Sequence, residues 1–166
     1  MQAVLPILAI IISVASLLVT VWLWRESNRP VVSVQVRTHS GGNVAILYNI
    51  VVTNSGSRPA KNVRLHMAHD ELMAAIAPEA HGKRDFNRQL TLIERCFDER
   101  ATVPLLLNGA SISNAFGQTG SELPFWRPGA IMQLALTYQG LRGQRYKASM
   151  PLRIDDTEGF AGSSYS

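Results

Sequence analysis

The feature that most constrains this chain is an uncharged apolar run near its N-terminus, AVLPILAIIISVASLLVTVWLW from Ala3 to Trp24. At about 1.5 Å per residue, a helix of this length spans a hydrocarbon core of roughly 30 Å. No Lys or Arg precedes the run, and it ends in bulky residues rather than in the small residues of a signal-peptide cleavage site. We therefore expect residues 1–24 to form a retained transmembrane anchor.

One face of the predicted helix carries small and hydroxyl-bearing residues, spaced four, three and four apart. Such a stripe allows two helices to approach closely, so it predicts a helix-packing face. The alternative is that lipid-exposed helices tolerate Ser and Thr because each hydroxyl can bond back to the carbonyl of residue i−4. The face consists of Ala9, Ser13, Ser16 and Thr20.

Aromatic and cationic residues close the anchor. Trp22, Trp24, Arg25 and Arg29 are expected at the membrane interface, where indoles and cations are favoured. Arg25, Arg29 and Arg37 follow the helix closely, and the single acidic residue in that stretch is Glu26. The positive-inside tendency favours a cytoplasmic position for the rest of the chain. The periplasmic side is the alternative, because short N-termini cross in either direction.

Beyond a short linker, residues 25–30, apolar residues recur mostly at every second position, the signature of β-strands. The segments are joined by turns and show no βαβ rhythm. We expect a mainly β chain in which an antiparallel sandwich fills residues 31–157 and a flexible tail fills 158–166. The alternating segments are 31–38, 43–54, 62–67, 131–138 and 145–154.

The middle of the chain, residues 70–127, has a mixed pattern and predicts short helical insertions. Asp70 is placed to cap a short helix over ELMAAIA that ends at Pro78. Residues 88–97 fit a helix or a strand equally well. Residues 103–116 predict two strands around a turn at Asn108-Gly109, and FWRPGA predicts a turn with its bend at Pro128-Gly129.

The stretch VVTNSGSRPAKNVRL, residues 51–65, predicts a strand, a polar corner and a second strand. An Asn side chain can bond its own backbone, and Gly accepts positive φ, so the chain can reverse there. Pro59 cannot donate to a central ladder and belongs at a strand start or an edge. The residues are explained as turn chemistry, so we expect the corner to be architecture.

The same stretch resembles the strand-corner-strand of bacterial immunoglobulin-like domains, in which Asn-x-Gly is followed by Ala-x-Asn-Val. The whole chain is similar to small bacterial proteins with a single membrane anchor and such a domain. The resemblance implies an immunoglobulin-like sandwich in a bacterial inner membrane, acting as an adhesive or scaffolding module rather than as an enzyme. The matching positions are Asn54, Gly56, Ala60, Asn62 and Val63.

Few residues suggest chemistry. His66, His69 and Asp70 are the candidate metal ligands, since zinc favours imidazole and carboxylate. On a strand, however, an odd offset points the two histidines to opposite faces, and no Cys pair completes the set. There is no nucleophile elbow or phosphate-binding glycine loop, and Cys96 is expected to be a small core residue. We expect neither an enzyme nor a cofactor.

Arg145, Lys147 and Arg153 share one face of the last strand and could contact an anionic membrane surface. The alternative is an ordinary solvated face. The net charge of +4 is mild, and no basic cluster alternates with aromatic residues, so we expect no nucleic-acid partner. No small-molecule substrate is indicated.

Together these features favour a non-enzymatic interaction or accessory subunit of a larger membrane protein complex, with a membrane protein and the lipid bilayer as partners. Two alternatives stay open. One is a metal- or ligand-sensing module built on His66, His69 and Asp70. The other is a solitary membrane-surface protein that binds anionic lipid.

Overall fold

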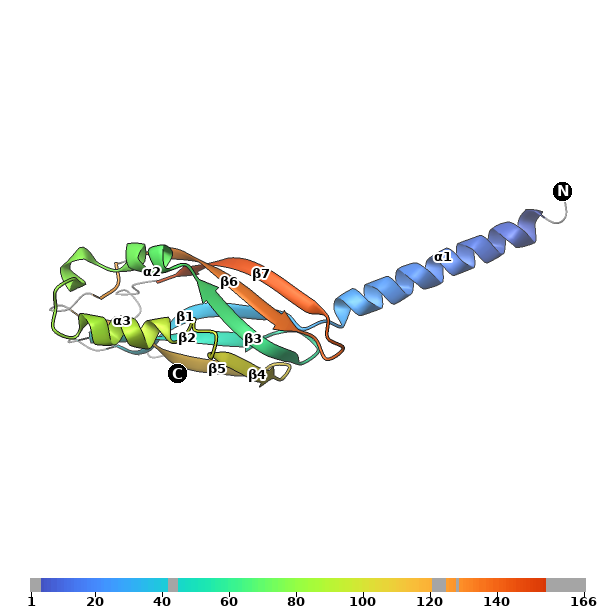
Figure 1. Cartoon of the computed structure of the whole chain (residues 1–166). Helices are drawn as coiled ribbons and strands as arrows, with labels where there is room; N and C mark the ends of the chain where they lie inside the picture. Colours follow the sequence, from blue (N-terminus) through green and yellow to red (C-terminus); the bar gives the residue numbers. More distant parts are fainter. Residues whose placement is uncertain (1–3, 42–44, 121–124, 128, 155–166) are drawn as a thin grey trace.

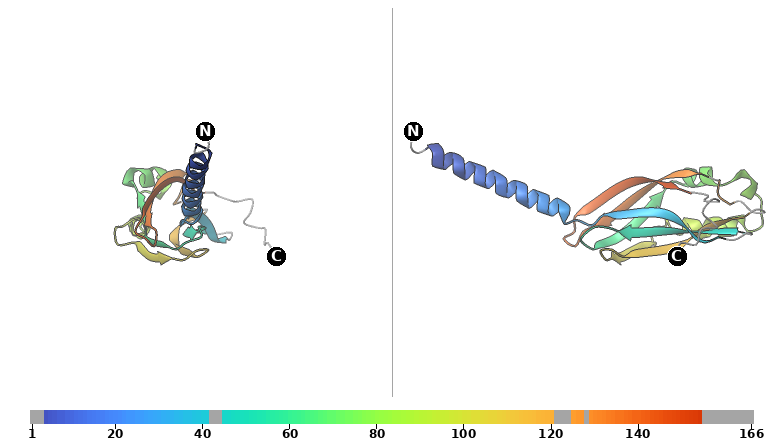
Figure 2. Two further views of the ribbon diagram at one scale, coloured as in Figure 1. Left: turned by 90° about the vertical axis from the view of Figure 1, so that its right-hand side faces the viewer. Right: turned by 180° about the vertical axis from the view of Figure 1, so that it is seen from behind.

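The computed structural model describes residues 4–41, 45–120, 125–127 and 129–154 (Figure 1). A long helix leads into a domain of two antiparallel β-sheets, so the chain is mainly β with a sandwich fold, as predicted. The views of Figures 1 and 2 show an elongated domain whose strands run roughly in the direction in which the long helix points. Short helical segments lie at the end far from that helix. Because α1 is the candidate membrane span, we call the end of the domain next to it membrane-proximal and the other end membrane-distal.

The helix α1 (Val4–Ser27) continues three residues past the predicted end of the anchor. Its segment Pro6–Ser27 is long and apolar enough to cross a membrane, and its side chains lie open to the surroundings. Asn28 ends the helix: its backbone N–H and its side-chain amide donate to the Trp24 carbonyl at 3.0 and 2.9 Å. Pro30 then prevents continuation. The linker to the first strand is therefore residues 28–31, which is shorter than the predicted linker of residues 25–30.

The first sheet has the order β1-β2-β5, formed by β1 (Val32–Gly41), β2 (Ala45–Asn54) and β5 (Ser111–Gly120). Val34 lies opposite Val52, which in turn lies opposite Ile112 on the other side. Because successive side chains of a strand point to opposite faces, the apolar members of each alternating run enter the core. The predicted strands at 31–38 and 43–54 are both present over the described residues.

The second sheet has the order β4-β3-β6-β7, formed by β3 (Ala60–Met67), β4 (Thr102–Leu106), β6 (Ile131–Gln139) and β7 (Arg145–Arg153). Pro59 precedes β3, as predicted. Asn62 has a φ of +50°, beside a register shift between β3 and β6. Asn tolerates this left-handed conformation better than most residues, so the Asn of the corner motif sits at a bulge.

The two strands predicted around Asn108-Gly109 form, but not as a hairpin. Gly109 adopts a φ of +70° in the turn. β4 pairs with β3, whereas β5 pairs with β2, so the turn carries the chain from one sheet to the other.

Between β3 and β4 the chain forms α2 (His69–Ala75), a short 3-10 segment η1 (Pro78–Ala80) and α3 (Phe86–Glu94). The predicted helix after β3 is present, but the prediction that Asp70 caps it was wrong. Ala68 is the N-cap, and Asp70 lies in the first turn, where a carboxylate still favours the positive end of the helix dipole. The ambiguous segment 88–97 is largely helical, because Ile93 on α3 packs into the core beside β5.

An aromatic cluster fills the core between the sheets and the short helices. The rings of Phe116 and Trp126 stack with centroids 4.8 Å apart, and Phe125 meets Trp126 edge-on at 5.0 Å. Trp126 Nε1 donates to the Phe116 carbonyl at 2.8 Å, which satisfies its buried N–H. The FWRPGA segment is therefore partly core. Pro128 of its predicted bend and the predicted tail 158–166 lie outside the described residues.

Candidate functional site

The polar corner between β2 and β3 is built on Asn54, whose exposed fraction is 0%. Its Oδ1 accepts from the backbone N–H groups of Val31 at 3.2 Å and Gly56 at 3.0 Å. Its Nδ2 donates to the carbonyls of Arg58 at 2.8 Å and Leu106 at 3.1 Å. A side-chain amide can make four hydrogen bonds of this kind, and all four are made.

The corner is also where the linker docks. A Cβ on Gly56 would lie 2.3 Å from the backbone nitrogen of Val31, with further linker backbone atoms at 2.5 and 2.8 Å. Only glycine allows this close approach. The Ser55 N–H donates to the Val31 carbonyl at 2.9 Å, and the Ser57 hydroxyl donates to the Ser27 carbonyl at 3.1 Å. We call residues 27–31 and 54–58 the anchor joint.

Aromatic side chains support the anchor joint from both sides. The Tyr138 hydroxyl donates to the Pro30 carbonyl at 3.3 Å, and burial raises the pKa of this phenol above its ordinary value. On the helix side, the Arg58 guanidinium lies 5.4 Å from the centroid of the Trp24 ring. The corner is thus architecture, as predicted, and it has a role that its local sequence did not indicate: its hydrogen bonds tie the long helix α1 to the sandwich.

The small-residue face of α1 lies open along the helix. The Ser13 hydroxyl donates to the Ala9 carbonyl at 2.8 Å, and the Thr20 hydroxyl donates to the Ser16 carbonyl at 2.8 Å. These are the i−4 bonds of the alternative explanation. They satisfy the hydroxyl groups of Ser13 and Thr20 within the helix, and the use of the stripe as a packing face stays a prediction.

The candidate metal ligands are not gathered into a site. His66 lies on β3, with its Nε2 3.1 Å from Thr137 Oγ1, whereas His69 begins α2, with its Nδ1 3.1 Å from Glu94 Oε1. Asp70 follows in the first turn of α2. Within residues 4–41, 45–120, 125–127 and 129–154, no group of three His, Cys, Asp or Glu side chains could hold a metal ion.

Cys96 lies in the core just after α3, as predicted for a small apolar residue. Burial raises the pKa of its thiol above the ordinary value, although the Asn114 amide, 3.4 Å from the sulfur, partly opposes this shift. A protonated, buried thiol is a poor nucleophile.

The basic face of β7 is as predicted: Arg145, Lys147 and Arg153 are exposed and alternate with inward-facing residues. However, β7 begins at the membrane-proximal end and runs away from α1 (Figure 1). At about 3.3 Å per residue, Arg153 lies roughly 26 Å along the strand from Arg145. Only the start of this face is close to the end of α1.

A groove that sequence reasoning missed opens between the two sheets, lined by the start of β4 on one side and the start of β5 on the other. It has a volume of about 240 Å³ and reaches the interior side chains of Val52, Val63 and Leu65. Ile112 shares their face, yet 46% of its surface is exposed because it stands on the edge strand β5. We call this groove the seam. Its sequence signal is weak: Val103 and Ile112, which line it from β4 and β5, are nine residues apart in the chain, and no local pattern links them.

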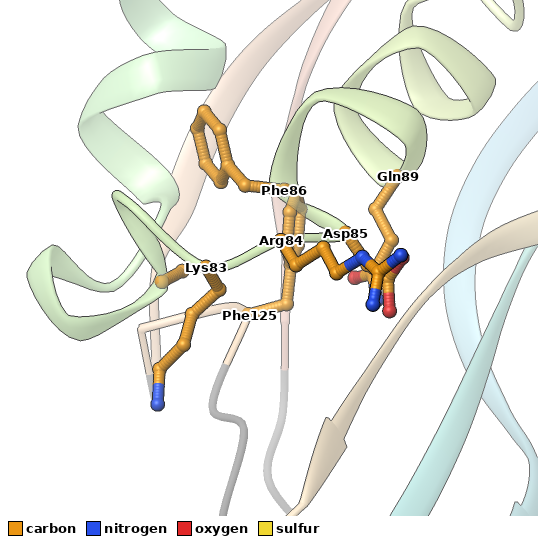
Figure 3. Close-up of a pocket in the computed structure, with 7 residues that line it drawn as sticks. Lys83, Arg84, Asp85, Phe86, Gln89 and Phe125 are labelled. Atoms are coloured by element: carbon orange, nitrogen blue, oxygen red, sulfur yellow. The ribbon is translucent and has the colours of Figure 1, made fainter.

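Another pocket, of about 260 Å³, lies at the membrane-distal end between the start of α3 and Phe125 (Figure 3). Arg84, Asp85 and Gln89 bring their polar ends together on one side of it, whereas Lys83 extends away on the other. Gln89 Oε1 is buried and has no hydrogen-bond partner among the described residues. The side chain as a whole is only half-buried, and we assign no ligand to this pocket.

Comparison with known proteins places the chain in a family. No curated protein matches it with significant similarity. A family model described as a domain of unknown function (DUF8453) matches residues 1–158. The match covers α1, the anchor joint and both sheets, so the apolar helix and the sandwich fall within a single family pattern. The chain therefore belongs to the DUF8453 family, a domain of unknown function.

Proposed function

We propose that this protein is a non-enzymatic accessory subunit, anchored by α1, whose sandwich binds a protein partner at the membrane surface. The observation that carries the proposal is the seam. A sandwich normally closes its core with side chains, but here interior residues are reached by a groove of about 240 Å³. Exposed apolar surface of this kind is typical of interaction sites.

The seam suggests the chemistry of its occupant. β5 is the edge of its sheet, and no described strand pairs with its free side. An edge strand offers unpaired backbone groups to an extended segment, and pockets beside it select the side chains of that segment. α3 packs near the later part of β5, around Gly117, which leaves the stretch around Ile112 as the accessible part. The partner would contribute an extended apolar segment.

The anchor joint supports the same proposal. Its hydrogen bonds hold the linker residues 28–31 against the corner, so the seam keeps a defined position relative to α1. Because the linker already holds the sandwich in one orientation relative to α1, binding to a partner in the same membrane loses less motional freedom. The free-energy cost of that binding is therefore smaller. The small-residue face of α1 would then pack against a helix of that partner.

We further propose that the membrane is a bacterial inner membrane, in keeping with the resemblance of the corner to bacterial immunoglobulin-like domains. The sandwich would lie on the cytoplasmic side, supported by Arg25, Arg29 and Arg37 after the helix. The single free thiol, Cys96, is compatible with a reducing compartment. The periplasmic side is the alternative, and labelling of an introduced surface cysteine in intact cells distinguishes the two.

Site-specific photocrosslinking tests the seam. A photoreactive phenylalanine replaces Ile112 in the full-length protein, expressed in its own host. Ile131 is the matched control, since it is an isoleucine with 58% of its surface exposed on the other sheet. We expect one adduct of discrete mass from position 112 and none from position 131. Identical adducts at both positions, or none at position 112, would remove the seam as the binding surface.

The helix face is tested separately. Ser13→Leu combined with Ser16→Leu fills the small-residue stripe without adding charge, and should release the protein from its complex if the stripe packs against a partner helix. Ile7→Leu combined with Ile11→Leu changes the opposite side of α1 and should have no effect. Unchanged co-migration of the Ser variant would limit the partner contact to the sandwich.

A further inference from the structure

A third cavity, a cleft, lies at the membrane-proximal end, between the end of α1 and the loop that joins β6 to β7. Figures 1 and 2 both show this loop beside the end of α1. The cleft has a volume of about 370 Å³. Its walls come from α1, from the corner of the anchor joint and from the β6–β7 loop. The side chains that matter for its chemistry are Trp22, Trp24, Arg25, Arg58, Leu141 and Arg142.

The cleft carries an excess of positive charge. Arg25, Arg58 and Arg142 line it, and within the described parts of the chain no carboxylate lies at ion-pair distance from any of them. Glu26, the acidic residue in its wall, is paired with Arg29 at 2.7 Å, which offsets its charge. Three guanidinium groups therefore line one cleft without a carboxylate partner among the described residues. Guanidinium groups match the geometry of phosphate oxygens and are the common choice for binding them.

The apolar side chains place this charge at a defined depth. Trp22 and Trp24 stand exposed at the end of α1, where indoles settle at the level of lipid headgroups. Arg58 lies over the Trp24 ring, with 5.4 Å between its guanidinium carbon and the ring centroid, so this cation is held at the cleft wall. Leu141 exposes 48% of its surface at the tip of the neighbouring loop. Indole, leucine and guanidinium groups together match the boundary between acyl chains and phosphates.

We propose that this cleft binds the phosphate group of an anionic phospholipid in the leaflet that holds the C-terminal end of α1. The three arginines would receive the phosphate, and Trp22 and Leu141 would contact the glycerol and acyl region. The lipid would fill the angle between helix and sandwich and so stabilise the orientation of the anchor joint. This site is separate from the seam, and its test does not depend on a protein partner.

Lipid binding to the full-length protein in detergent micelles tests the proposal. Native mass spectrometry would follow titration with short-chain phosphatidylglycerol, and with phosphatidylcholine of the same chain length. We expect one bound phosphatidylglycerol, with an affinity about tenfold or more above that for phosphatidylcholine. The double variant Arg58→Gln, Arg142→Gln should weaken phosphatidylglycerol binding by about tenfold, because each cation near an anionic surface contributes measurably.

The matched control is Lys147→Gln with Arg153→Gln, which removes the same formal charge from the outward face of β7. It should leave the affinity unchanged. Equal weakening by both variants would reduce the effect to general charge attraction and overturn the cleft as a site. Equal binding of the two lipids by the wild-type protein would overturn it independently of any variant. Displacement of the lipid by an equal concentration of glycerol phosphate would show that a soluble phosphate, not a lipid, is the ligand.

Discussion

The backbone N–H of Val31 donates a hydrogen bond of 3.2 Å to the side-chain oxygen of Asn54, 23 residues further along the chain. This bond attaches the last linker residue to the corner between β2 and β3. The family match also spans both α1 and the sandwich.

Replacing Asn54 by Ala should strongly destabilise the sandwich. The change would remove a fully buried amide and leave two backbone N–H groups and two carbonyls, buried or partly buried, without their partner. A loss of about 3 kcal/mol or more in the free energy of unfolding is expected. For a domain of this size, that lowers the melting temperature by roughly 6–12 °C, measured by circular dichroism on the full-length protein in micelles. Asn87→Ala, at an exposed position on α3, is the control and should change little.

Replacing Gly56 by Ala should loosen the anchor joint. The added Cβ would collide with backbone atoms of the linker at 2.3 and 2.5 Å, and backbone cannot move aside cheaply. Hydrogen exchange should show faster exchange of the Val31 and Ser55 amides. Gly82→Ala, at a φ of +85° with open space around its Cβ, imposes strain without a collision. Gly82→Ala should leave the two amides protected. If Gly56→Ala leaves them equally protected, the close approach at Gly56 is not what holds the anchor joint.

The Cys96 thiol should react slowly in the folded protein. Its burial blocks access, and its raised pKa lowers the thiolate fraction at neutral pH. A thiol reagent such as dithionitrobenzoate should modify it only after urea is added. Ser113→Cys in a Cys96→Ala background, at an exposed position on β5, should react at once. Rapid modification of native Cys96 would contradict its place in the core.

Stability should decline in alkali. Burial raises the pKa of Cys96 above 9.0 and that of Tyr138 above 10.0, so the folded state keeps both protons to a higher pH than the unfolded state does. The resulting stabilisation is present below these values and is lost as pH rises past them. The melting temperature should therefore fall from about pH 9 upward. Cys96→Ala should delay the onset of this fall, and an identical profile in that variant would exclude the thiol as a cause.

The strands were predictable because a half-buried strand imposes a period of two on its side chains. β6 is the clearest case, with Met132, Leu134 and Leu136 at 0% exposure between exposed neighbours. Which strand pairs with which was not predictable. The turn at Asn108-Gly109 has the composition of a hairpin, yet periodicity carries no information on the sheet that each strand enters.

The surfaces proposed as sites could largely not be predicted from the sequence, for the same reason. Local pattern indicated that Asn54 could bond its own corner, whereas two of its four partners, Val31 and Leu106, are remote in the chain. Likewise Arg58 and Arg142 line the same cleft only because the end of β6 packs against the linker, where Tyr138 bonds Pro30. The seam depends on β4 and β5 belonging to different sheets.

The native mass of the full-length protein, extracted from its own membranes in mild detergent, tests directly whether the protein is a subunit that binds through the seam. We expect a stoichiometric second protein that is lost in Ile112→Glu and kept in Ile131→Glu, two substitutions at comparably exposed isoleucines. A wild-type protein that runs alone at the mass of one chain, or a partner lost equally in both variants, would contradict the assignment of this protein as a subunit that binds through the seam.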